Sequence, residues 1–153
     1  MLDNQQERLE FSNWIVGFTD GEGCFTVSIF KNSTTKLGWQ IFPEFVITQN
    51  EQDEKLLHLI QKFFKCGIVK LNRRQDNHKF NLYQYSVRNI EDLRKIIIPF
   101  FKQNSLRTKK RKDFQIFSRI VQRIIRKEHL NKKGFKAIAD LASKMNRQKK
   151  RKF

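Results

Sequence analysis

Apolar residues recur along the chain with two different periods, and segments with one period alternate with segments with the other. Between residues 11 and 18 they follow the three-to-four-residue spacing of a helix, for which Ser12 or Asn13 is a suitable N-cap. From Cys24 to Lys31, and again from Gln40 to Gln49, apolar and polar residues alternate as in half-buried strands. The first third of the chain therefore predicts a helix followed by a pair of strands.

The same succession then repeats. Asp53 is a suitable N-cap for a second helix, and a second strand pair is predicted at about residues 68–73 and 80–87. Pro43 lies inside the second strand of the first pair. Because proline cannot donate a backbone hydrogen bond, it indicates an edge position or a bulge there.

Helices follow in the rest of the chain. A short helix from Ile90 to Ile97 is expected to end at Pro99, and two longer helices are predicted from Phe114 to Ile125 and from Phe135 to Met145. Strand pairs separated by helices indicate the α+β class. We expect an antiparallel sheet that helices cover on one face and leave exposed on the other.

The excess of basic residues limits the kinds of molecule that the protein is expected to bind. Lys and Arg number 32 against 15 Asp and Glu, and the resulting net charge of +17 implies a polyanion, nucleic acid above all. A membrane surface is the weaker alternative, since the basic residues are spread over every segment and no apolar run could span a bilayer. With 15 Phe to build a core, residues 1–146 are expected to form one domain, followed by a disordered basic tail at 147–153.

Other chemistry finds little support. Cys24 and Cys66 lie far apart and, with the three histidines, show no zinc-site spacing, so we interpret them as thiols in a reducing compartment. The polar N-terminus shows neither a signal peptide nor a transit peptide. No HNH-like histidine cluster, Cys-His arrangement or phosphate-binding glycine loop is visible.

The end of the first helix carries the most informative pattern. Gly17 and Gly21 are four residues apart, and the acids Asp20 and Glu22 alternate with glycines up to Gly23. In a basic chain that binds a polyanion, acids presented by a glycine-rich turn can hold a divalent metal beside a phosphate. This arrangement suggests a nuclease.

These residues resemble a known family. The run Val16-Gly17-Phe18-Thr19-Asp20-Gly21-Glu22-Gly23, followed at once by a strand, is similar to the signature of the LAGLIDADG homing endonucleases. The similarity extends to Ile47-Thr48-Gln49 and to the stretch from Pro99-Phe100-Phe101 to Lys109-Lys110, and covers roughly residues 8–126. It implies an αββαββα fold with extra C-terminal helices and an organellar gene of a chloroplast or mitochondrion.

The resemblance implies a role for each part of the motif. Gly17 and Gly21 would let two motif helices pack closely, and a single motif implies a homodimer with a pseudo-palindromic DNA target. Glu22, where the family more often has Asp, matches the metal-binding acid, and the Gly21 carbonyl is a further ligand. The expected metal is Mg²⁺, with Mn²⁺ or Ca²⁺ as other occupants of the site. Asp20 is interpreted as structural.

Two further positions match residues near the scissile phosphate. Gln49 corresponds to a position that orders water around the metals, although a plain polar strand end is an equal alternative. Lys109 or Lys110 corresponds to a basic residue at the phosphate, and the sequence does not choose between them.

Base contacts are expected from the exposed sheet face, where polar side chains can enter a major groove. Strand parity predicts which residues share this face, and Tyr85 could equally belong to the core. The expected DNA-binding residues are Thr26, Ser28, Lys31, Gln40, Phe42, Glu44, Lys70, Asn72, Arg74, Asn81, Tyr83 and Tyr85. Phosphate contacts are expected from Lys109 to Lys112 and from Arg119, Arg123 and Arg126.

Three functions are compatible with these features. The first is an Mg²⁺-dependent, dimeric, site-specific endonuclease for double-stranded DNA that initiates intron mobility. The second is an RNA-binding maturase that helps its host intron fold, and the third is a non-catalytic DNA-binding protein on the same fold. Retention of Glu22, Gln49 and the lysine run favours cleavage.

Overall fold

The computed structural model describes residues 4–73 and 79–145. Arg74 and the predicted tail at 147–153 lie outside the described residues. The helices and strands, with η marking 3₁₀ and π segments, are α1 (Gln5–Glu22), β1 (Gly23–Lys31), β2 (Trp39–Asn50), η1 (Glu51–Asp53), α2 (Glu54–Phe64), β3 (Ile68–Asn72), β4 (Leu82–Val87), α3 (Ile90–Asp92), η2 (Leu93–Ile97), α4 (Ile98–Gln103), α5 (Lys110–Ile125), η3 (Glu128–Leu130) and α6 (Lys132–Ser143).

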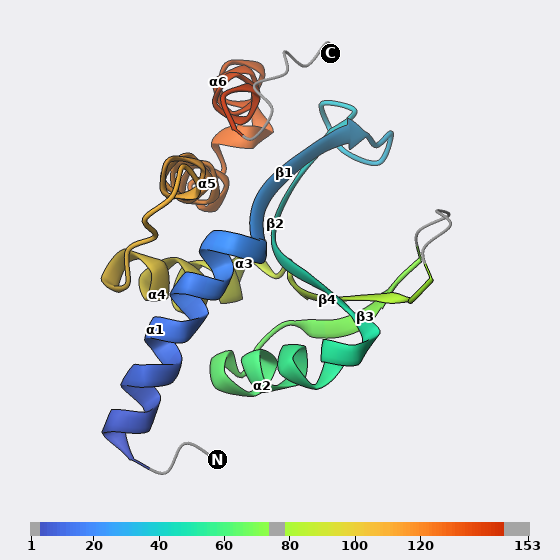
Figure 1. The fold of residues 1–153 in the computed structure, drawn as a ribbon. Helices are drawn as coiled ribbons and strands as arrows, with labels where there is room; N and C mark the ends of the chain where they lie inside the picture. The colour runs from blue at the N-terminus through green and yellow to red at the C-terminus, as the bar shows by residue number, and fades with distance from the viewer. Residues whose placement is uncertain (1–3, 74–78, 146–153) are drawn as a thin grey trace.

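The four strands form one antiparallel sheet in the order β1-β2-β4-β3. The sheet is strongly curved, and the helices lie on its outer, convex side, whereas no helix of the described residues covers the concave side (Figure 1). The predicted α+β class and the one-sided helical layer are therefore confirmed.

Strand alternation separates the two faces of the sheet. Phe25, Phe45 and Tyr85 point toward the helices and are fully buried. The ring of Phe25 lies 5.0 Å from that of Phe45 and 5.4 Å from that of Phe101 in α4. Each buried phenylalanine contributes about 1.5–3 kcal/mol through the hydrophobic effect. The phenylalanine-rich composition therefore builds the layer that fixes the helices on the sheet.

Pro43 occupies a local edge of the sheet, as its sequence predicted. β2 is a central strand, but its pairing with β4 stops at Phe45, opposite Val87. At Pro43 the strand therefore has β1 as its neighbour, through the pair with Val27, and no strand of the described part of the chain on the other side. The missing amide hydrogen breaks no pairing with β4.

The start of the first helix was predicted wrongly. α1 begins at Gln5, and the cap is Asn4, whose Oδ1 accepts a hydrogen bond from the Glu7 amide at 2.8 Å. Ser12 lies inside the helix, and its hydroxyl donates to the Arg8 carbonyl one turn earlier. The first turns of α1 are polar and charged, so apolar periodicity does not indicate where the helix begins.

The prediction that Pro99 ends a helix was also wrong. The helical path continues from α3 through the π-helical η2 into α4, and Pro99 occupies the first turn of α4. Proline is tolerated in a first helical turn, and the wider π turn directly before it accommodates the missing amide. Pro99 therefore marks a joint between two helical segments.

The C-terminal helices extend the covered face along the β1–β2 hairpin. α6 follows α5, and the Phe135 ring lies 6.4 Å from the ring of Trp39 at the start of β2. Cys24 and Cys66 are both partly buried thiols that form no disulfide, and burial raises the pKa of each. Within residues 4–73 and 79–145, no helix has the length and apolar character needed to cross a membrane.

Candidate active site and nucleic-acid interface

Gly23 allows the chain to pass from α1 directly into β1. A Cβ at this position would lie 2.6 Å from the Thr19 methyl carbon and 3.0 Å from the Thr19 carbonyl oxygen. The Gly23 amide donates to that same carbonyl and so closes the last turn of the helix. The absence of a side chain therefore lets Glu22 stand at the junction between the helix and the sheet.

Asp20 connects this junction to the segment before α5. One carboxylate oxygen accepts from the Arg107 amide at 2.9 Å, and the other accepts from the amide and the hydroxyl of Thr108 at 3.1 and 2.7 Å. Partial burial opposes ionisation, but these hydrogen bonds and the nearby Lys110 hold the pKa of the Asp20 carboxyl below its usual value. The structural interpretation of Asp20 is confirmed.

Lys110 is the lysine that contacts the motif helix. Its Nζ donates to the Thr19 carbonyl at 3.0 Å, so the first residue of α5 is held against the last turn of α1. Lys109 precedes α5 and is exposed, and its ammonium group makes no contact with another described residue. The geometry thus distinguishes two lysines that the sequence could not.

Glu22 faces solvent at the C-terminal end of α1, beside the exposed Gly21. Its carboxylate forms no hydrogen bond or ion pair with any described residue. The described part of the chain contains no group of three or more acidic, histidine or cysteine side chains that could hold a metal. One chain therefore offers a free carboxylate next to the carbonyl oxygens of a helix end, a partial oxygen donor set that suits a hard, hydrated cation.

Gln49 lies two residues beyond this junction on the neighbouring strand. The first pair of the β1–β2 ladder joins Gly23 to Ile47, and Gln49 follows on β2 opposite Tyr83. It is partly buried and lies near the strand end, as predicted. Sheet pairing thus brings the matched positions of motif and strand to the same edge of the molecule.

One face of α1 has no neighbour among the described residues. No atom lies within 4 Å of a Cβ placed on Gly17 or on Gly21, and both glycines are exposed. Trp14, near the same stripe, is 38% exposed. The glycines therefore leave room for another backbone.

Most of the expected base-contacting residues share the concave face of the sheet. The strand register places on this face the predicted residues Thr26, Ser28, Gln40, Phe42, Glu44, Lys70 and Asn72. All seven are exposed or partly exposed. The alternation of β1 and β2 predicted the five members on these two strands, because both strands have a clear apolar side, and the alternation of β3 predicted Lys70 and Asn72.

Four expected residues do not belong to this face. Tyr83 and Tyr85 point toward the helices, and the hydroxyl of the fully buried Tyr85 donates to the Cys66 carbonyl at 3.1 Å. Lys31 has the parity of the covered face, and its ammonium lies 5.8 Å from the centre of the Trp39 ring. Asn81 precedes β4, and its backbone carbonyl accepts a hydrogen bond from the Glu51 amide. The parity chosen for β4 was wrong by one residue.

Three residues of this region that do face the concave side were not predicted, namely Gln84 and Ser86 in β4 and Arg88 directly after it. Their signal was present, because polar residues at 84, 86 and 88 alternate with apolar ones at 85 and 87. Tyrosines at 83 and 85 obscured it, since tyrosine is frequent on either face of a sheet.

The basic residues of α5 divide into two groups. Lys112 is exposed in the first turn, close to the junction with α1. Further along, Arg123 forms an ion pair with Glu128 at 2.7 Å, so its charge is compensated. Arg119 belongs to a separate hollow between α4 and α5. Only the N-terminal group lies beside the motif.

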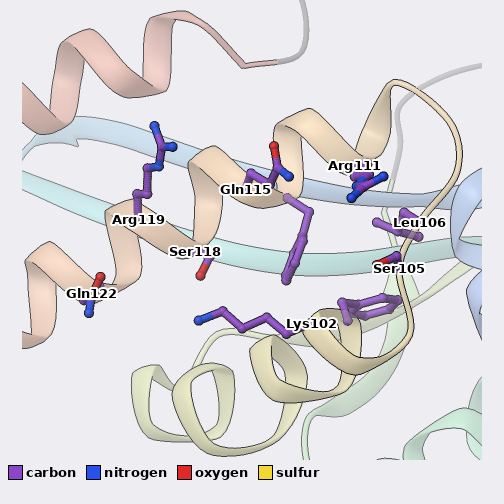
Figure 2. A pocket seen from close by; sticks show the side chains of 10 residues that line it. Lys102, Ser105, Leu106, Arg111, Gln115, Ser118, Arg119 and Gln122 are labelled. Atoms are coloured by element: carbon purple, nitrogen blue, oxygen red, sulfur yellow. The ribbon is translucent and has the colours of Figure 1, made fainter.

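The hollow between α4 and α5 has a volume of about 450 Å³. Its lining contains the cations Lys102, Arg111 and Arg119 and no acid, above the buried rings of Phe101 and Phe114. Lys102 extends between the two helices beside Ser118 (Figure 2). No residue of the motif and no residue of the concave face lines this hollow, so it is separate from the candidate site.

Together these features define a protein with the homing-endonuclease fold: a curved, one-sided antiparallel sheet with a free acid at the end of its first helix. Residues 15–121 match the family model described as LAGLIDADG endonuclease. The chain belongs to the LAGLIDADG endonuclease family.

Known relatives agree with this assignment. The chain is 37% identical over 136 residues to a probable intron-encoded endonuclease 2 of Neurospora crassa, covering 88% of this chain and 29% of the relative. The crystal structure of the homing endonuclease I-TnaI superposes with a TM-score of 0.82 at 40% identity, covering 90% of this chain and 89% of that one. I-SmaMI, bound to uncleaved DNA target with calcium ions, gives a TM-score of 0.81 at 34% identity, covering 88% and 44%.

The extent of these matches differs. The chain spans between 25% and 29% of the length of four curated relatives, from Neurospora, Podospora and Schizosaccharomyces. It spans nearly the whole I-TnaI chain but less than half of the I-SmaMI chain. The family and the fold are therefore shown, and the activity of this chain is a matter for proposal.

Proposed function

We propose that this chain is a site-specific endonuclease for double-stranded DNA that works as a homodimer with a divalent metal and initiates intron mobility. The observation that carries the proposal is the free carboxylate of Glu22, held at the junction of the motif helix and the open sheet, with Lys110 fixed beside it. The names of several relatives as intron-encoded endonucleases support it, and they also support an organellar gene.

Mg²⁺ is the proposed cofactor, with Mn²⁺ or Ca²⁺ as other occupants. Glu22 and the Gly21 carbonyl would hold the ion, which supplies an activated water and stabilises charge on the leaving oxygen. The I-SmaMI complex with uncleaved DNA, obtained in the presence of calcium ions, supports a divalent site. A hard cation such as Mg²⁺ keeps several water ligands and also binds phosphate oxygens. The two oxygen ligands that one chain offers, from Glu22 and Gly21, are therefore compatible with such an ion.

The chain's own residues then prepare the phosphate and the water. Lys110, rather than Lys109, approaches the scissile phosphate, because its position against α1 is fixed by the Thr19 carbonyl. Gln49 orders water at the adjoining strand end. The concave face receives the duplex, and Lys112 contacts a phosphate near the motif.

The homodimer forms through the uncovered glycine stripe of α1. Pairing two copies across Gly17 and Gly21 would bring two Glu22 carboxylates to the same central region, one for each DNA strand. Coverage of 89% of the I-TnaI chain supports a unit of this size. Two identical halves would favour a pseudo-palindromic target.

The experiment that tests this proposal uses a DNA duplex in which the two sequences that flank the intron of this gene are joined directly. We expect the full chain to cut this duplex in Mg²⁺ and not in excess chelator, and to elute at twice its monomer mass. Binding of the duplex without cutting would contradict the proposal and favour a non-catalytic DNA-binding protein. Preferred binding of the intron RNA, again without cutting, would contradict it in favour of a maturase.

A further inference from the structure

The concave face carries an acid near its centre, which is unexpected on a surface that meets a polyanion. Glu44 lies on β2 opposite Thr26, and its side chain is 15% exposed. One carboxylate oxygen accepts hydrogen bonds from the Ser86 hydroxyl and, at 2.9 Å, from Nε of Arg88. The acid is therefore bound within the protein before any DNA arrives.

Arg88 is held by two contacts at once. While Nε donates to Glu44, the guanidinium carbon lies 5.1 Å from the centre of the Phe42 ring. The side chain remains 44% exposed, and its two terminal amino groups have no acceptor among the described residues. The planar group is thus oriented, with its outer hydrogen-bond donors free.

We propose that Arg88 is a specificity-determining residue that donates to the O6 and N7 acceptors of one guanine in the major groove, and that Glu44 and Phe42 position it. The inference rests on the proposed function, since it assumes that the concave face meets duplex DNA. In a homodimer the contacted guanine recurs once in each half of the target. The paired terminal N–H groups of arginine match the two acceptors of guanine.

The charge of the Glu44–Arg88 pair favours contact of Arg88 with a base over contact with a phosphate. Because Glu44 compensates the charge of Arg88, the pair attracts a phosphate far less than a free cation does, but its terminal donors are unaffected. Lys70 on the same face has no side-chain partner among the described residues and is the better phosphate ligand. Glu44 lies on the central strand β2 and Arg88 directly after the central strand β4, so in a complex with duplex DNA the pair would face the groove floor rather than its rim.

The test measures binding to a library of duplexes randomised over the target, in Ca²⁺ to suppress cutting, followed by sequencing. We expect Arg88→Ala to reduce the preference for guanine at one position in each half-site by about 5- to 150-fold. Preferences elsewhere and the dependence of affinity on salt stay unchanged. Arg88→Lys retains the positive charge but lacks the paired terminal N–H groups of arginine, so it should keep only part of the preference for guanine.

Lys70→Ala is the control for a phosphate contact, and it should weaken all sequences alike and flatten the salt dependence. Glu44→Ala should lower the guanine preference while raising affinity for random DNA. An Arg88→Ala variant of unchanged thermal stability that behaves like Lys70→Ala, or keeps every preference, overturns the inference. Failure of the proposed function is distinguishable, because it appears as absent metal-dependent cutting by the unmodified chain.

Discussion

The last turn of α1 has an inward side and an outward side, and an acid on each. Asp20, facing inward, accepts three hydrogen bonds from Arg107 and Thr108, whereas Glu22, two residues later and facing outward, has no partner among the described residues. The two acids have nearly the same place in the sequence but different environments. The comparison teaches that an acid's hydrogen-bond partners, rather than its place in a motif, separate a structural role from a chemical one.

The largest effect is expected from Glu22→Gln. If the outward acid holds metal, cutting of the target falls by at least about a thousandfold, while the melting temperature is unchanged because no contact is lost. Glu10→Gln, the same change a little over three turns earlier on α1, is the control and should cut normally. Undiminished cutting by Glu22→Gln would remove the distinction between the two acids.

Asp20→Ala tests the inward side. Two amides and one hydroxyl lose their acceptor, so the free energy of unfolding should fall by about 1–3 kcal/mol, nearer the lower figure because the site is partly exposed. Cutting should fall moderately through displacement of Lys110, and Asp20→Asn should restore part of both. Urea denaturation measures the stability, and a variant as stable as the unmodified chain would contradict the account.

Substitutions of two glycines, one on each side of α1, test the same difference between the inward and outward sides. Gly23→Ala places a methyl group against Thr19 on the inward side and should lower the free energy of unfolding by about 1–3 kcal/mol. Gly17→Ala meets no atom of the described residues, so the fold should be as stable or slightly more stable, with dimerisation weakened instead. Thermal unfolding and sedimentation measured on both variants check the prediction. Equal losses of stability would show that the two sides do not differ.

The smallest effect is a dependence of stability on pH. The pKa of Asp20 is lowered in the folded chain, so its ionised form contributes stability above the usual value of 3.8. This contribution is lost as the pH falls through the lowered folded value. The stability difference between the unmodified chain and Asp20→Asn should therefore be constant near neutral pH and shrink in strong acid. A difference that grows below pH 3.8 would contradict the assignment.

The sequence predicted the elements whose residues alternate clearly. β1 and β2 have one plainly apolar side, so their faces followed directly, as did five expected contact residues on these two strands and two on β3. β4 was assigned the wrong parity because tyrosine fits either face, and only packing against Phe45 of β2 and Phe64 of α2 decides for Tyr85. The cap at Asn4 was hidden by a polar first turn.

The candidate site was predictable in its residue types but not in its partners. The motif separated Glu22 from Asp20 by resemblance, yet the link from Asp20 to Thr108 spans 88 residues of sequence and leaves no local signal. The contact that distinguishes Lys110 from Lys109 spans 91 residues, and the Glu44–Arg88 pair spans 44. Long-range polar pairs of this kind follow from tertiary packing, which periodicity does not reveal.

The central claim is that the outward acid binds metal and the inward acid does not. It is tested most directly by calorimetric titration of Ca²⁺ into the complex of the chain with its target duplex. We predict saturable binding for the unmodified chain and for Asp20→Asn, and none above the DNA background for Glu22→Gln. Undiminished binding by Glu22→Gln, or its loss in a folded Asp20→Asn variant, would contradict the account.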